Sequence, residues 1–233
     1  KAYDNLLLAI KHFDNITIDL IYGTPALTNE KWEQNIKTAI LMGIPHLSCY
    51  ALTVEPKTPL DKLIRQQKSA DINPDKQSEQ FLLLMQWLSD AGYEHYEISN
   101  FARPGRRSRH NSSYWKGEKY LGIGPSAHSF SVNERQWNIA NNVAYIESIS
   151  KGIIPCEKEQ LTRTQQLNEY IMISLRTSEG LSLNKINSDD AIKFKAAAQK
   201  YIDAGLLRFE NDSYVLTNEG KLLADGIASS LFF

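Results

Sequence analysis

Short strand-like runs that alternate with helical patterns constrain this chain more than any other feature of its first hundred residues. Residues 16–22 and 46–53 are rich in apolar and β-branched side chains, and residues 93–99 form a third short run. Apolar residues at helical spacing fill the two intervals between these runs. Strands that alternate with helices usually pair in parallel and are covered by those helices. The sequence therefore predicts an α/β fold, either a barrel or an open sheet.

Cap residues give the two intervening helices sharp ends. Thr28 has the residue type of an N-cap, and Gly43 closes the helix that follows it. Asn73-Pro74 opens the second helix as N-cap and first helical residue, and Gly92 ends that helix. Both helices are long enough to cover a pair of strands.

The pattern changes after Pro155. Two helices are expected there, over residues 164–176 and from Asp189 to Ala204, the second capped by Ser188. A hairpin turns at Asn211-Asp212, and Thr217 caps a last helix that runs to about Ala228. Helix, helix, hairpin and helix is the order of a winged-helix-like domain. Residues 1–155 are therefore expected to form one domain and residues 156–233 a second.

Charge argues against nucleic acid as a partner. The whole chain has a formal net charge of -1, and residues 160–233 hold 8 Lys/Arg against 9 Asp/Glu. A winged-helix-like domain that bound DNA would need a surplus of cations to neutralise phosphates. We interpret this domain as a packing or partner-facing module.

Hydrophobic content of 42% suits an ordinary packed core, and no run of eighteen apolar residues or charged-then-apolar leader is present. A soluble, cytoplasmic protein is expected. Cys49 and Cys156 lie far apart, which indicates a reducing compartment and excludes a self-contained cysteine-bound cluster or zinc site. The chain begins at Lys1 inside a helical pattern, so we expect it to be cut from something longer.

Residues 108–115 (Ser-Arg-His-Asn-Ser-Ser-Tyr-Trp) concentrate groups that could carry chemistry. Imidazole can ligate iron, aromatic faces can stack on a macrocycle, and guanidinium groups can pair with carboxylates. One interpretation is a site for a planar, anionic, metal-bearing ligand such as haem. The other is an exposed loop whose histidine is simply hydrogen-bonded. The surrounding segment 103–119 holds six Lys/Arg and one Glu, a local surplus that suits propionates or phosphates.

Two other places attract polar ligands. Asp19 sits inside an apolar strand, where a carboxylate is costly unless it is paired or reaches a ligand. Thr53 lies at the carboxyl end of the next strand, where α/β folds bind their ligands. In the segment Leu121–Ser129, the glycines are expected to let the backbone approach a ligand closely. His128 has two interpretations, a second ligand or a core histidine, and the core histidine is favoured.

Four segments in order carry a family resemblance: residues 19–25 (Asp-Leu-Ile-Tyr-Gly-Thr-Pro), 96–105 (Tyr-Glu-Ile-Ser-Asn-Phe-Ala-Arg-Pro-Gly), 110–115 (His-Asn-Ser-Ser-Tyr-Trp) and 121–128 (Leu-Gly-Ile-Gly-Pro-Ser-Ala-His). Over essentially its whole length the chain resembles radical S-adenosylmethionine proteins of the oxygen-independent coproporphyrinogen III oxidase family, in particular their haem-chaperone branch.

The resemblance implies the C-terminal part of a partial (β/α)6 barrel, with residues 16–22 and 46–53 as its last two strands, followed by the winged-helix-like domain. It also assigns ligand contacts, which are Asp19, Thr53 and His128 for S-adenosylmethionine and His110, Asn111, Tyr114 and Trp115 for haem. His110 would ligate the haem iron. No catalytic residue is assigned. The His-Asn-x-x-Tyr-Trp motif is typical of the chaperones and absent from the oxidases, which favours a chaperone that transfers haem to acceptor proteins.

Two departures from the family pattern matter. Residues 22–28 read Tyr-Gly-Thr-Pro-Ala-Leu-Thr in place of Tyr-Gly-Leu-Pro-Gly-Gln-Thr. The Cys-x-x-x-Cys-x-x-Cys motif that holds the family's [4Fe–4S] cluster is expected upstream of Lys1, so these residues alone should be catalytically inert. The alternatives are a coproporphyrinogen III oxidase of porphyrin biosynthesis and a non-catalytic interaction module. Peripheral contact with a membrane is a further expectation, and nucleic acid is not expected.

Overall fold

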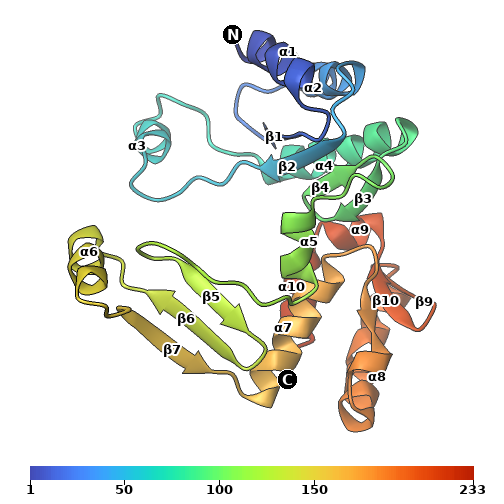
Figure 1. Ribbon diagram of the computed structural model, residues 1–233. Coiled ribbons are helices and arrows are strands. Elements are labelled where there is room, and N and C mark those ends of the chain that lie inside the picture. Colours follow the sequence, from blue (N-terminus) through green and yellow to red (C-terminus); the bar gives the residue numbers. More distant parts are fainter. The chain divides into compact units, whose positions relative to one another are not determined.

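The computed structural model describes residues 1–233 and divides them into two compact units. The first unit comprises residues 1–108 and 216–222, and the second comprises residues 109–215 and 223–233 (Figure 1). The sequence places a domain boundary at residue 155 because the type of domain changes there, whereas these two units are defined by their compactness. The boundary at residue 155 stays a prediction. No helix combines the length and the apolar character needed to cross a membrane.

A four-stranded sheet in the order β1-β2-β4-β3 forms the first unit. Its strands are β1 (Thr17–Tyr22), β2 (His46–Ala51), β3 (Glu94–Glu97) and β4 (Asn100–Ala102). The parallel pair β1–β2 confirms the predicted α/β arrangement, and the sheet does not close into a barrel.

Strand β4 corrects the expectation of a purely parallel sheet. It pairs antiparallel with β2 and with β3, so it separates the two strands that were expected to be neighbours. The parallel pair formed by β1 and β2 is thus extended by the antiparallel strands β4 and β3. A three-residue strand that follows a tight hairpin carries no periodicity of its own, which explains why the sequence did not reveal it.

Two long helices, α2 (Asn29–Leu41) and α4 (Pro74–Asp90), cover one face of this sheet, and the shorter α1 (Ala2–His12) precedes β1. Trp32 and Ile36 of α2 pack with Leu84 of α4 against Leu47 of β2, and all four are fully buried. The N-caps are those predicted, because Thr28 accepts from the amide of Lys31 and Asn73 from that of Lys76. Since strand side chains alternate between faces, the opposite face of the sheet carries Thr17, Asp19, His46 and Ser48.

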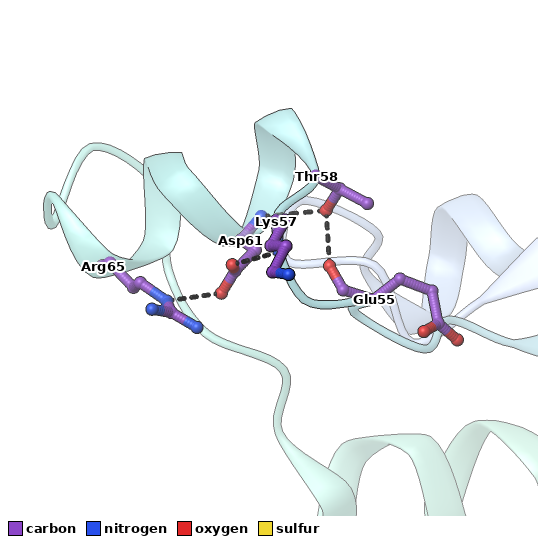
Figure 2. Close-up of polar contacts among 5 residues, drawn as sticks. All are labelled: Glu55, Lys57, Thr58, Asp61 and Arg65. Atoms are coloured by element: carbon purple, nitrogen blue, oxygen red, sulfur yellow. Dashed lines mark hydrogen bonds and ion pairs between the residues drawn. The ribbon is translucent and has the colours of Figure 1, made fainter.

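A long excursion with the short helix α3 (Pro59–Arg65) links β2 to α4. Figure 2 shows that Asp61 accepts from the backbone amide of Lys57 at 2.7 Å and from Arg65 Nε at 2.7 Å, while the Thr58 hydroxyl donates to the carbonyl of Glu55 at 2.8 Å. These contacts are all local. The hydrogen bonds to Asp61 hold the pKa of its carboxyl below the ordinary value.

The second unit begins with helix α5 (Arg109–Trp115), in a segment that the sequence predicts as a loop. An antiparallel sheet of β5 (His128–Ser131), β6 (Glu134–Asn138) and β7 (Cys156–Gln160) follows, with α6 (Asn142–Ser150) between β6 and β7. Strand β7 was not predicted, because its alternating Glu and Lys side chains are polar on both faces.

The C-terminal elements have the predicted winged-helix-like order. They are α7 (Arg163–Leu175), β8 (Leu181–Ser182), the 3-10 turn η1 (Leu183–Lys185), α8 (Ser188–Asp203), β9 (Leu207–Glu210), β10 (Ser213–Leu216), α9 (Asn218–Lys221) and α10 (Ala224–Ser230). Asn211 and Asp212 both have positive φ, at 49° and 61°, as a two-residue hairpin turn requires.

Two details of this region differ from the prediction. The N-cap of α8 is Asn187 rather than Ser188, because its side chain accepts from the amide of Asp190. The expected single helix after Thr217 is divided into α9 and α10.

Candidate functional site

Helix α5 presents the His-Asn-x-x-Tyr-Trp motif. His110 and Tyr114 are four residues apart and so lie on the same helix face, with ring centroids 5.1 Å apart in an edge-to-face arrangement. Asn111 is partly buried one position further along. Of the residues that the family resemblance assigns to haem, His110 and Tyr114 are therefore the two whose rings could contact one flat ligand together.

The imidazole of His110 is exposed, and neither of its nitrogens is hydrogen-bonded to the protein. The only side-chain hydrogen bond at this position goes to its carbonyl, which accepts from Ser113 Oγ at 2.8 Å. An open imidazole nitrogen is what ligation of a metal requires. The alternative of a histidine satisfied by hydrogen bonds in a loop is wrong on both counts, since the segment is helical and the ring is unpaired.

Trp115 occupies a different environment from Tyr114. Its ring lies under the guanidinium of Arg176, with Cζ 5.6 Å from the ring centroid, and Arg176 in turn pairs with Asp225 at 2.6 Å. The indole Nε1 is buried and makes no hydrogen bond. A buried donor without an acceptor costs free energy, so an ordered water or a ligand atom that accepts from Nε1 would stabilise this position.

The basic segment 103–119 offers fewer cations to a ligand than its composition suggests. Arg103 donates to the carbonyl of Ala91, and Arg106 and Arg107 pair with Asp14 and Glu94. Three of its cations are thus used to hold the first unit together. The remaining ones, Arg109, Lys116 and Lys119, flank α5, are exposed and have no ion pair. These are the cations that an anionic ligand beside His110 could meet.

Asp19 lies in the first unit, on the polar face of the sheet, in register with Ser48. Its carboxylate is exposed and accepts no hydrogen bond from the protein, so it is free to accept one from a ligand hydroxyl or amine. Thr53 follows the last residue of β2 by two positions and is also exposed. Both side chains are accessible, as contact with a polar ligand requires.

A hydrogen-bonded network beside Asp19 was not predicted. His46 lies 2.7 Å from both Thr17 Oγ1 and Tyr96 Oη, and Ser48 donates to Asn100 Oδ1 at 3.1 Å. Burial lowers the pKa of His46, although the Asp19 carboxylate opposes this, and burial raises the pKa of Tyr96 to about 12. The signal that could have found this network is the alternation of polar residues along two neighbouring strands.

His128 lies on β5 in the second unit, opposite Trp137, with the ring centroids 6.4 Å apart. It is exposed, so the expectation of a core histidine is wrong. Of the two glycines before it, Gly122 packs against the chain itself, whereas a Cβ at Gly124 would meet no atom within 4 Å. A Cβ at Gly122 would lie 2.2 Å from the carbonyl oxygen of His128, so the close approach expected for a ligand is made to β5 instead.

The residues fit haem and do not fit an iron–sulfur cluster. An exposed imidazole, an adjacent aromatic ring and unpaired cations match the iron, the macrocycle and the propionates of haem. A [4Fe–4S] cluster is held by Cys thiolates, whereas these 233 residues have two cysteines, Cys49 and Cys156, one in each unit. No group of three or more His, Cys, Asp or Glu side chains could hold a metal ion.

Comparison with known proteins gives consistent results for sequence and fold. Residues 161–223 match the HemN C-terminal domain. The chain is 33% identical over 220 residues to the heme chaperone HemW of Mycobacterium tuberculosis, covering 94% of this chain and 55% of that protein. It is 31% identical over 221 residues to the heme chaperone HemW of Bacillus subtilis, covering 92% and 58%. The chain thus spans little more than half the length of these curated relatives.

Among solved structures, the chain is similar to coproporphyrinogen III oxidase (HemN) from Escherichia coli, described as a radical SAM enzyme. The TM-score is 0.76 at 20% sequence identity, and the match covers 99% of this chain and 58% of that one. At this identity the likeness shows a shared fold.

Proposed function

The chain belongs to the HemW-like family of radical S-adenosylmethionine proteins, and from that premise we propose that it binds haem at helix α5 and passes it to haem-accepting proteins. The observation that carries the proposal is the open imidazole of His110. Haem supplies an iron with axial coordination positions. The protein supplies His110 as the axial ligand, with Tyr114 beside it.

The charge and exposure of the site at α5 support a protein that delivers haem rather than one that stores it permanently. The site lies on an exposed helix face, and the unpaired cations Arg109, Lys116 and Lys119 are exposed side chains suited to propionates. A ligand held by one axial bond and by solvent-screened charges can be released to a protein that encloses it. Asn111 and Trp115 would support the site from within the helix, Trp115 through its unpaired Nε1.

The second part of the proposal concerns S-adenosylmethionine. Within the first unit, Asp19 would accept a hydrogen bond from the ligand and Thr53 would be a further contact. His128, in the second unit, is a contact that the family resemblance alone implies. Support comes from the exposure of all three side chains and from the family to which the chain belongs. The residues present hold no cluster, so we derive no reductive step through it.

The other functional candidates have less support. The oxidase alternative rests on a structural neighbour of 20% identity, which bears on the fold alone. The interaction-module alternative leaves the unpaired imidazole of His110 without a role. We therefore retain the haem chaperone as the proposed function, with a cytoplasmic location and peripheral membrane contact as unconfirmed parts of the prediction.

Titration of the 233-residue chain with ferric haem tests the proposal. We expect a saturable shift of the Soret band that His110→Ala abolishes or weakens at least tenfold, since the axial bond is lost. The matched control is His12→Ala, which removes an exposed histidine at the end of α1. An identical spectrum and affinity in the His110→Ala protein would overturn the ligand assignment.

A further inference from the structure

A series of aromatic rings continues from the His110 motif into the β5 hairpin. Tyr114 meets Tyr120 edge-to-face with centroids 4.9 Å apart, and Tyr120 stacks on Phe130 at 5.9 Å with an interplanar angle of 27°. Together with His110 these residues form an unbroken sequence of four rings, which we call the aromatic series.

Backbone geometry fixes the position of Tyr120 in this series. Gly117 ends α5 with φ of 67°, and its amide donates to the carbonyl of Tyr114 at 3.0 Å. The chain then turns back, and Tyr120 and Phe130 exchange backbone hydrogen bonds of 3.1 and 3.0 Å. Tyr120 is therefore held between the helix and the hairpin rather than left at the end of a free loop.

The aromatic series is more open than packing alone would require. The residue exposure of Tyr114 is 40% and that of Tyr120 is 37%. Exposed rings that follow one another from an open metal ligand provide apolar contact area, and the exposed face of a single ring can stack on a planar ligand. Burial of its inner part and the Tyr114 phenol raise the pKa of Tyr120, while the guanidinium of Arg135, itself paired with Glu169, lowers it. The charged group nearest the phenol is therefore the Arg135–Glu169 ion pair and not a free cation.

We propose that Tyr120 is a ligand-contact residue whose ring provides a stacking surface for a tetrapyrrole, and that Phe130 positions this ring from behind. The inference rests on the proposed function, since it extends the site at which His110 would ligate haem. It differs from the assignment of His110 because it concerns contact with the macrocycle and not ligation of the iron. It therefore predicts binding of a porphyrin that has no metal.

Iron-free protoporphyrin IX is the probe that separates the two claims. The unmodified chain should bind it saturably, measured by quenching of tryptophan fluorescence. Tyr120→Leu should raise the dissociation constants for protoporphyrin and for haem by about three- to tenfold, the range expected for loss of one aromatic contact. Tyr120→Phe keeps the ring and should stay within about twofold of the original. The control is Tyr3→Leu, an exposed tyrosine on α1 without a ring partner.

The outcomes distinguish failure of the inference from failure of the function. If His110→Ala weakens haem binding while Tyr120→Leu changes neither ligand, the inference is overturned and the function stands. If Tyr120→Leu weakens protoporphyrin binding while His110→Ala leaves haem binding unchanged, the inference stands and the assignment of His110 as the haem ligand is overturned. No protoporphyrin binding by the unmodified chain also overturns the inference.

Hydroxyl-radical footprinting of the unmodified chain gives a result even if Tyr120→Leu does not fold. Bound protoporphyrin should protect Tyr120 from oxidation and leave Tyr3 unaffected, as read by mass spectrometry. Equal oxidation of Tyr120 with and without protoporphyrin would contradict the inference.

Discussion

The imidazole Nε2 of His46 lies 2.7 Å from the phenol oxygen of Tyr96, while its Nδ1 lies 2.7 Å from Thr17 Oγ1. The three residues come from β2, β3 and β1, so one buried ring joins three strands on the polar face of the sheet. A buried polar group with both nitrogens satisfied is tolerated, and removal of either partner leaves a donor or acceptor unpaired. This network should therefore contribute to the stability of the face that carries Asp19.

Removing the Tyr96 hydroxyl tests that contribution. Tyr96→Phe should lower the free energy of unfolding by about 1–2 kcal/mol, since the His46 nitrogen loses its buried partner. Urea denaturation followed by circular dichroism measures the change. Tyr3→Phe, which removes an exposed hydroxyl on α1, should leave the free energy unchanged. Equal stability of the two variants would refute the structural role of the network.

His95 should make the chain sensitive to acid. Burial and, second to it, repulsion from Lys221, whose Nζ lies 3.1 Å from His95 Nδ1, together lower its pKa to about 3. The unfolded chain binds a proton at this position below about pH 6.5, whereas the folded chain does so only near pH 3. Stability should therefore fall with decreasing pH across this window, by up to about 1.4 kcal/mol per pH unit.

The variant His95→Gln removes this titration and should flatten the pH dependence of the unfolding free energy between about pH 6 and pH 3. His46, whose pKa is also lowered by burial, contributes a residual slope of the same sign in both proteins. A slope that is the same with and without His95 would show that its imidazole is not kept neutral by the fold.

Two glycines test the close approach of the 121–124 segment to β5. A Cβ at Gly122 meets the backbone of His128 at 2.2 Å, whereas a Cβ at Gly226 has no atom within 4 Å. Neither has a positive φ. Gly122→Ala should lower the free energy of unfolding by about 1–3 kcal/mol, because the added methyl group overpacks the site. Gly226→Ala in α10 should raise the free energy of unfolding slightly. Thermal melts of both proteins provide the measurement, and equal shifts would mean that the segment is not held against β5.

Local signals predicted the elements that local chemistry determines. The caps at Thr28 and Asn73 and the turn at Asn211-Asp212 lie where the sequence predicted them, since each depends on residues within three positions. Strand β4 and helix α5 were missed. Strand β4 is defined by pairing with distant strands, and α5 contains serines with weak helix propensity, so packing rather than propensity sets both.

The candidate site was predictable by residue type but not by arrangement. The sequence identified His110, Tyr114 and Asp19, whose chemistry is evident from the side chain alone. It overestimated the cationic site, because pairing of Arg106 with Asp14 depends on a partner 92 residues away. It also missed Tyr120, which reaches Tyr114 only through the turn at Gly117.

Rescue of His110→Ala by free imidazole is the most direct test of the central claim. The ring of His110 is exposed, so a small ligand can reach the space it leaves. Absorbance spectra of the haem-loaded protein, freed of unbound haem, are recorded before and after imidazole is added. We predict that the His110→Ala spectrum lacks the ligated Soret band and that imidazole restores it, with no change in His12→Ala. A His110→Ala spectrum identical to that of the unmodified chain before imidazole is added would contradict the account.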